Sequence, residues 1–133
     1  MSEILVDTSV WIEFFREPDS KWGKAVELLL AEERVCTTPL VMVEVISGAR
    51  NRSEFNRLRT DFEALPRVDP PGDLWEQLLE NRWQLKNHGI TGISVPDMIV
   101  AYVALAHQKI IFTRDEDFRR MQSFLKFKLL ELS

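Results

Sequence analysis

The residues of this chain that could do chemistry are carboxylates that stand where apolar elements begin or end, or inside an apolar helix. An isolated charge at such a place costs several kcal/mol unless it is solvated, paired or bound to a metal. Like charges within about 4–6 Å raise one another's pKa, so a cluster of them is tolerated mainly around a divalent cation. The acids at such places are Asp7, Glu44, Asp97, Asp115 and Asp117.

A set of carboxylates offers only oxygen ligands, and these select hard cations such as Mg²⁺. A water held on such a metal becomes a nucleophile near neutral pH, and the metal stabilises charge on a transferring phosphoryl group. The reaction that this set of acids can support is therefore the hydrolysis of a phosphodiester.

The elements that must position these acids can be read from the apolar periodicity. Short apolar stretches predict strands at residues 4–6, 34–37, 67–69, 109–112 and 127–132. Helical spacing predicts helices at about 9–16, 20–30, 38–48, 53–65, 73–88, 96–107 and 115–125. This alternation predicts an α/β fold, a three-layer sandwich with a mostly parallel central sheet, as a single domain over residues 1–133. Ligands gather beyond the carboxyl ends of parallel strands, so acids from separate segments can meet at one edge.

Each acid also has a purely structural interpretation. Asp7 could cap the helix that begins near Ser9. The stretches 94–97 and 113–116 both fit a capping box. Glu44 could be an ordinary solvated helix residue, although its neighbours are apolar and predict poor solvation on most faces. Capping does not require the whole set, and this favours a shared metal site.

The composition is that of an ordinary globular protein, with 45% hydrophobic and 29% charged residues in 133. No apolar run approaches the roughly 18 residues of a membrane helix, and no signal peptide is evident, so we expect a cytoplasmic protein without membrane contact. Cys36 is alone and there are two histidines, which excludes an internal disulfide and any cysteine-rich or histidine-rich metal site. The net charge of −4 argues against a protein that coats nucleic acid through bulk charge.

Four stretches of the sequence match a known family in its order. They are "ILVDTSVWI", "TPLVMVEVISGA", "VPDMIVAYVALAH" and "IIFTRDEDF". With these stretches the chain resembles the PIN-domain ribonucleases, and most closely the small VapC-type toxins of prokaryotic toxin–antitoxin pairs. The resemblance spans nearly the whole chain.

By position, the resemblance implies roles for the acids and for the hydroxyls beside them. Asp7 and Asp97 would be the principal metal ligands, Glu44 and Asp115 would complete the catalytic pocket, and Asp117 would be a fifth member. The hydroxyls that would orient ligands and water by hydrogen bonds are those of Thr8, Ser9 and Thr113.

The same resemblance implies a function and partners. We expect an endoribonuclease that needs Mg²⁺ or Mn²⁺, cuts RNA, and acts as the toxin of a type II toxin–antitoxin pair. We also expect a homodimer, which a small antitoxin would hold inactive in a larger hetero-oligomer. Trp11 and Trp22 are candidates for lining the antitoxin groove between the first two helices.

Two positions depart from the family pattern. Tyr102 stands where the family usually has a small residue, and Gln108-Lys109 replaces the glycine common before the strand at 109–112. Neither position is an acid of the site, so the departures concern local packing.

An RNA substrate also needs positive contacts. We hypothesise that basic side chains close in sequence to the site elements bind phosphate groups of the RNA; the alternative is that they are ordinary solvated arginines. These side chains are Arg16, Arg50, Arg52, Arg114 and Arg119.

Two other functional classes compete with the nuclease. An aspartate-dependent phosphatase or phosphoacceptor also places an aspartate after its first strand, but 7–9 lacks the second aspartate of the hydrolase pattern. In a non-catalytic binding module, the acids would only cap helices.

Overall fold

The computed structural model describes residues 2–132, in which strands and helices alternate. The strands are β1 (Ile4–Val6), β2 (Val35–Cys36), β3 (Ile110–Phe112) and β4 (Lys128–Leu129). The helices are α1 (Thr8–Arg16), α2 (Lys21–Ala31), α3 (Pro39–Ile46), α4 (Arg52–Glu63), α5 (Leu74–Asn87), α6 (Val95–His107) and α7 (Asp117–Gln122).

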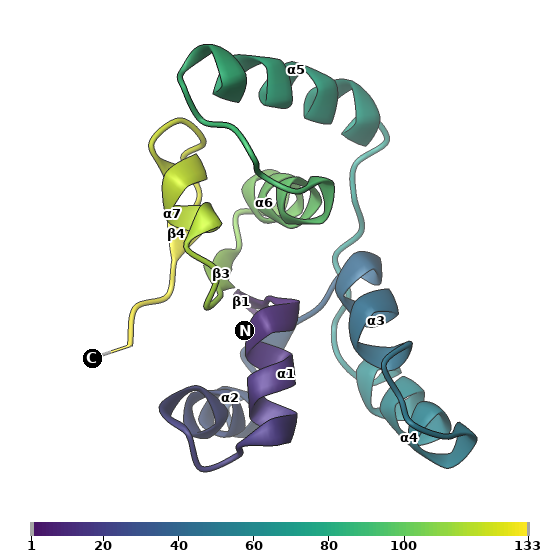
Figure 1. Cartoon of the computed structure of the whole chain (residues 1–133). Helices are drawn as coiled ribbons and strands as arrows, with labels where there is room; N and C mark the ends of the chain where they lie inside the picture. Colours follow the sequence, from purple (N-terminus) through teal and green to yellow (C-terminus); the bar gives the residue numbers. More distant parts are fainter. Residues whose placement is uncertain (1, 133) are drawn as a thin grey trace.

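The strands form one parallel sheet in the order β2-β1-β3-β4, which confirms the predicted fold class. The sheet lies between helical layers, with α1 and α2 on one side and α5 and α6 on the other (Figure 1). Both faces of β1 are therefore covered, and Ile4, Leu5 and Val6 are fully buried. This explains why β1 reads as a continuous apolar run instead of an alternating one.

Two predicted strands are largely absent. Residues 67–69 contribute only an isolated parallel bridge between Arg67 and Thr37, because the chain turns away after Val68 donates to the carbonyl of Thr37. The strand predicted at 127–132 shortens to β4, since it pairs with β3 alone at the edge of the sheet.

The register of the two inner strands sets the position of the site. Val6 pairs with Phe112, and the amide of Asp7 donates to the carbonyl of Phe112 over 2.9 Å. The next residues on the two strands, Asp7 and Thr113, therefore leave the sheet side by side.

Helix α6 is apolar nearly all round and packs against β3, α5 and α7. It begins at the cap residue Ser94 with Pro96 in its first turn. It ends at Gln108, whose φ of 57° and ψ of 43° place it in the left-handed region that favours glycine. Gln108 is one of the two residues, with Lys109, that were expected to replace a glycine common in the family that the sequence resembles. Among residues 2–132, no helix is long and apolar enough to cross a membrane.

Candidate active site

Three aspartates converge at the carboxyl edge of the sheet. Asp97 comes from the first turn of α6, Asp115 from the turn after β3, and Asp117 from the start of α7. One carboxylate oxygen of each lies within 4.8 Å of those of the other two. Acids about twenty residues apart in sequence thus share one small volume.

The local backbone holds this cluster in shape. The Ser94 hydroxyl accepts a hydrogen bond from the amide of Asp97 over 3.2 Å, so the helix cap positions the first acid. Asp115 Oδ1 accepts from the amide of Asp117 over 2.9 Å, which ties the other two acids into one turn. A helix cap and an aspartate turn are both present, yet neither requires the three carboxylates to face one another.

Asp7 is a buried acid near this cluster, with 4% of its surface exposed, and its charge acts on Asp97. It stands at the N-cap position of α1, but its side chain makes no hydrogen bond of standard cap geometry. Instead, the hydroxyls of Ser9 and Thr113 each donate to Asp7 Oδ2 over 2.8 Å. Burial raises the pKa of Asp7, and these two hydroxyls oppose the rise.

The same hydroxyls connect Asp7 to the segment after β3. Thr113 Oγ1 also accepts from the amide of Asp115 over 3.0 Å, and Ser9 Oγ accepts from the amide of Arg114 over 3.0 Å. Two short hydroxyl side chains therefore join the end of β1 to the turn that carries Asp115.

The electrostatics of the site favour a bound cation. Burial, followed by the neighbouring Asp115 carboxyl and the charge of Asp7, raises the pKa of Asp97 to about 7. A carboxyl with a pKa of about 7 is protonated in about half of the molecules at pH 7, and a bound cation would take the place of that proton. The clustered donors are all oxygens, as Mg²⁺ and Mn²⁺ require, so the residues present fit a hard divalent cation.

Comparison with known proteins identifies the family. The PIN domain family model matches residues 4–123. The chain belongs to the PIN-domain family. VapC ribonuclease Mb1587 of Mycobacterium bovis is 30% identical over 118 residues, which are 86% of this chain and 88% of the relative.

Solved structures share the PIN fold of this chain. VapBC-1 from nontypeable Haemophilus influenzae has a TM-score of 0.75 at 19% identity, covering 96% of both chains. VapBC-5 from Mycobacterium tuberculosis, a member of the VapBC family of toxin-antitoxin systems, has a TM-score of 0.64 at 19% identity, covering 98% and 99%. At these identities the likeness establishes the fold alone.

Glu44 of this PIN domain lies apart from the three clustered aspartates. The expectation of poor solvation is wrong, because α3 buries Val41, Val45 and Ile46 and leaves Glu44 exposed. Its Oε1 accepts a hydrogen bond from Thr8 Oγ1 over 2.7 Å, which places it beside the start of α1. Glu44 thus stands at the margin of the site. It is held by a hydrogen bond from Thr8, the residue that follows Asp7 in the sequence.

Most of the arginines predicted to bind RNA are engaged within the PIN domain. Arg50 pairs with Glu54, Arg114 pairs with Glu13 and lies 4.3 Å from the Trp22 ring centroid, and Arg119 pairs with Glu116 and Glu131. Arg52 lies over the ring of Phe55. Within residues 2–132, Arg16 forms no ion pair, which leaves its charge available to a ligand.

Arg120 was not among the predicted site residues, and it touches the site directly. Its guanidinium donates to Asp117 Oδ1 over 3.0 Å and to the carbonyl of Thr91 over 2.6 Å. It therefore links α7 to the loop that leads into α6. The spacing of three residues between Asp117 and Arg120 on a helix is the signal that could have found it.

Proposed function

We propose that this PIN-domain protein is a metal-dependent endoribonuclease and the toxin of a type II toxin–antitoxin pair. The convergence of Asp97, Asp115 and Asp117 within 4.8 Å carries the proposal, because three acids so close together call for a cation. The name of the curated relative, a VapC ribonuclease, supports RNA as the substrate. The VapBC name of the structures with the same fold supports a small antitoxin as the partner.

In this proposal Asp97, Asp115 and Asp117 would hold Mg²⁺ or Mn²⁺, and Asp7 would add negative charge nearby. When bound, the cation would supply positive charge to the transferring phosphate and lower the pKa of a water. Thr113 and Ser9 hold Asp7 and the turn of Asp115 in fixed relation, so that the acids are in place before substrate arrives. Arg120 keeps Asp117 turned toward α6.

The competing functions fit the geometry less well. A phosphoacceptor needs an aspartate that an incoming phosphoryl group can reach, and Asp7 is 4% exposed with Oδ2 occupied by two hydroxyls. In a module whose acids only cap helices, nothing would require Asp97, Asp115 and Asp117 to bring their carboxylate oxygens within 4.8 Å of one another. Both observations favour the nuclease.

A groove on this chain that could receive part of an antitoxin lies beside the site. A hollow of about 600 Å³ lies between α1, α3 and α4, and Glu44 and Arg16 are among its lining residues. Ile12 and Phe15 are 45% and 47% exposed there, so an amphipathic helix could bury an apolar face against them. Trp11, expected to line an antitoxin groove, is buried against Phe62 instead.

The test is cleavage of a single-stranded RNA by the purified chain with Mg²⁺ or Mn²⁺, with EDTA, and with the metal restored. We expect cleavage only with metal, and its loss in Asp97→Asn and Asp115→Asn. Glu116→Gln is the matched control, because Glu116 stands between two of the acids in sequence but its side chain is 83% exposed and outside the cluster. Full cleavage in EDTA, or undiminished cleavage by Asp97→Asn, would refute the proposal.

A further inference from the structure

The amino edge of the sheet, at the other end of the strands from the acidic cluster, has a hollow lined by three lysines. The hollow measures about 470 Å³, and Lys109, Lys126 and Lys128 are among its lining residues. Lys128 pairs with Ile110 across β3 and β4, so the lysines come from two neighbouring strands and the turn before one of them. Within residues 2–132 none of the three lysines forms an ion pair.

The acid that shares this hollow with the lysines is already neutralised. Glu3 lines the hollow, but its carboxylate accepts a hydrogen bond from Arg34 Nε over 2.7 Å and is paired with that guanidinium. The segment that supplies two of the lysines, residues 118–130, contains four basic residues and no acid, although the whole chain has a net charge of −4. Basic residues gathered on one part of an acidic protein are typical of a nucleic-acid contact.

We propose that this lysine-lined hollow binds phosphate groups of the single-stranded RNA that enters the acidic site. The inference takes RNA as its ligand from the proposed function. Lys109 and Thr113 stand just before and just after β3, and a strand of that length spans about 13 Å. Stacked nucleotides advance about 3.4 Å each along one strand, so roughly four of them cover this distance. The lysines would hold the backbone of the RNA without reading its bases.

Each lysine also has a structural explanation. Lys109 follows the end of α6, and Lys126 donates to the carbonyl of Ser123 over 3.4 Å at the end of α7, where positive charge complements the helix dipole. Lys128 stands on the edge strand β4, where a lysine hinders pairing with another chain. None of these roles requires RNA, so a measurement of RNA binding separates them from the proposal.

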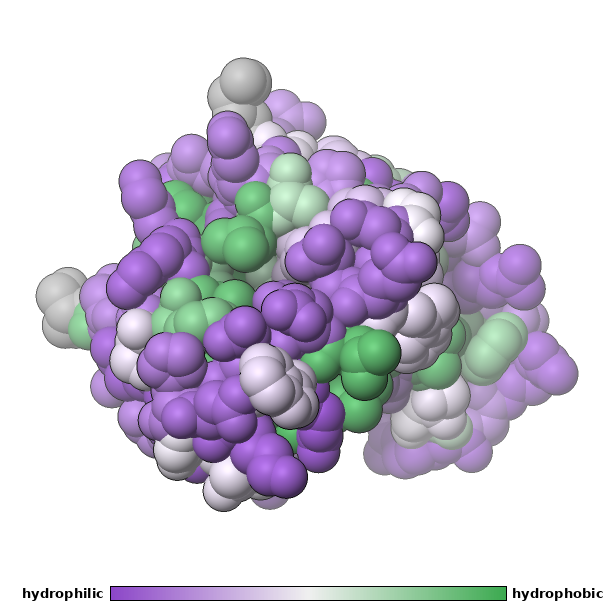
Figure 2. Space-filling model, turned by 90° about the horizontal axis from the view of Figure 1, so that it is seen from above, coloured by the Kyte–Doolittle hydropathy of each residue, from purple (hydrophilic) through white to green (hydrophobic). Residues whose placement is uncertain are grey.

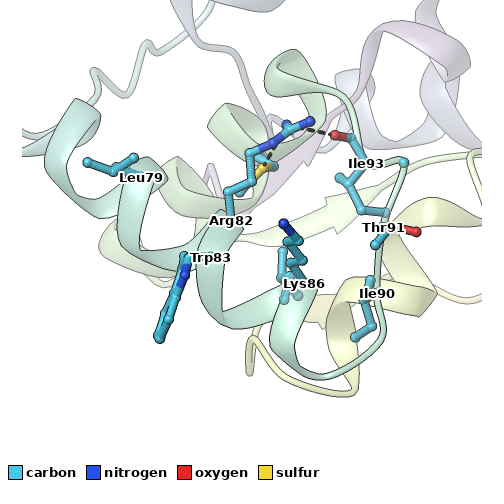
Figure 3. Close-up of a pocket in the computed structure, with 10 residues that line it drawn as sticks. Leu79, Arg82, Trp83, Lys86, Ile90, Thr91 and Ile93 are labelled. Atoms are coloured by element: carbon cyan, nitrogen blue, oxygen red, sulfur yellow. Dashed lines mark hydrogen bonds between the residues drawn. The ribbon is translucent and has the colours of Figure 1, made fainter.

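The α5 side of the molecule is less suited to phosphate groups. Figure 2 shows this side from above, with hydrophobic patches among its hydrophilic residues. The hollow beside the last turns of α5 has mainly apolar lining residues, and Arg82 there donates to the carbonyl of Ile93 over 3.0 Å (Figure 3). Lys86 is the one lysine among the lining residues of that hollow. It therefore serves as part of a control for the three clustered lysines.

The first experiment measures the binding of a fluorescent polyuridine strand of about 20 nucleotides by anisotropy, in EDTA and over a range of salt concentrations. The hollow is remote from the acids, so this binding should not need metal. In the triple variant Lys109→Gln, Lys126→Gln, Lys128→Gln, the slope of log affinity against log salt should shrink by about 2, because each single-strand phosphate contact contributes about 0.7. At about 0.1 M salt, the affinity should fall at least about 10-fold.

The matched control replaces the other three lysines of the chain by glutamine, which changes the net charge by the same amount. These are Lys21, Lys24 and Lys86, which are outside the lining of the hollow. The control should change the slope by less than about 0.7. Circular dichroism checks that both variants are folded. The same loss of slope in both variants, an unchanged slope in the first, or a wild type that does not bind polyuridine in EDTA would overturn the proposal.

The second experiment identifies the source of the phosphate by competition against the labelled strand. Unlabelled polyuridine should displace it at far lower concentration than inorganic phosphate or uridine monophosphate, because several lysines bind one strand together. Displacement by the mononucleotide at equal concentration would assign the hollow to a small anion, and stronger displacement by duplex DNA would assign it to DNA. Either result would overturn the proposal.

The third experiment places the hollow in the reaction. With Mn²⁺, the first triple variant should cleave RNA with a raised KM and an unchanged kcat, since the lysines hold the strand away from the acids. A lowered kcat with an unchanged KM would overturn the proposal. A wild type that does not cleave RNA would refute the proposed function alone, because the binding in EDTA is measured separately.

Discussion

The hydroxyl of Thr113 donates a hydrogen bond to Asp7 Oδ2 over 2.8 Å, although 106 positions separate the two residues in the sequence. The pairing of Val6 with Phe112 brings them together, because each is the first residue beyond its strand. The same hydroxyl accepts from the amide of Asp115, so it joins a buried acid to one in the cluster. A side chain without charge thus sets the relative position of two charged ones.

Thr113→Val should weaken the site while preserving the fold. Valine matches the shape of threonine but removes the hydrogen bonds to Asp7, to the Ser9 hydroxyl and to the amide of Asp115, so we expect metal affinity and RNA cleavage to fall by about 10–100-fold. Thr60→Val is the control, because Thr60 donates only to the Asn56 carbonyl on the exposed side of α4. Mn²⁺ titration and a cleavage assay measure the effect. Wild-type affinity in Thr113→Val would contradict the positioning role.

Asp97→Asn should stabilise the metal-free protein at pH 8. The pKa of Asp97, about 7 in the folded protein, lies above its ordinary value of 3.8, so the folded state binds its proton more tightly. That contribution to stability is complete below the ordinary pKa and is lost as the pH rises toward 7. Above pH 7 the wild type carries an unfavourable charge that asparagine lacks.

Thermal unfolding in EDTA at pH 4.5, 6 and 8 measures this effect as the difference between variant and wild type. The variant's advantage in Tm should grow with pH. Added Mn²⁺ at pH 8 should raise the Tm of the wild type more than that of the variant. A Tm difference between variant and wild type that shrinks as the pH rises would show that the charge of Asp97 does not destabilise the metal-free folded protein.

Asp117 and Glu44 should differ in their importance for metal binding. Asp117 lies within the cluster, so Asp117→Asn should weaken Mn²⁺ binding by at least about 10-fold. Glu44 is exposed and accepts a hydrogen bond from Thr8, so Glu44→Gln should change the affinity for Mn²⁺ by less than about 3-fold. Calorimetric titration compares the two variants. The reverse order would mean that α3 moves toward the cluster when metal binds.

Gln108→Gly should stabilise the protein without changing the site. Gln108 adopts a left-handed backbone conformation at the end of α6. This conformation has a higher free energy for a residue with a Cβ atom than for glycine. After the greater freedom of glycine in the unfolded chain is subtracted, we expect a gain of about 0.5–1 kcal/mol. Ser47→Gly is the control, because Ser47 ends α3 in the right-handed region and should gain nothing. Urea denaturation measures both variants, and equal effects would exclude this explanation.

The sequence by itself determined the order and type of most elements and the places where acids stand beside them. Continuous apolar runs predict the buried strands β1 and β3, and proline after a serine or threonine cap predicts the starts of α3 and α6. These features are local, because strand and helix periodicity report burial of one element at a time. The short pairing at residues 67–69 is predicted less well, since a bridge depends on where the partner backbone runs.

Only the tertiary structure decided which acids meet and which apolar residues stay exposed. Asp117 joins Asp97 and Asp115 while Glu44 remains at the margin, because these distances depend on strand register and on the packing of α6 against α7. In the sequence of α5, Trp75 and Leu79 have the same apolar character as Leu78 and Leu85, yet only the latter two are buried. Apolar character predicts that a side chain avoids water, whereas the surface that covers it is set by elements distant in the chain.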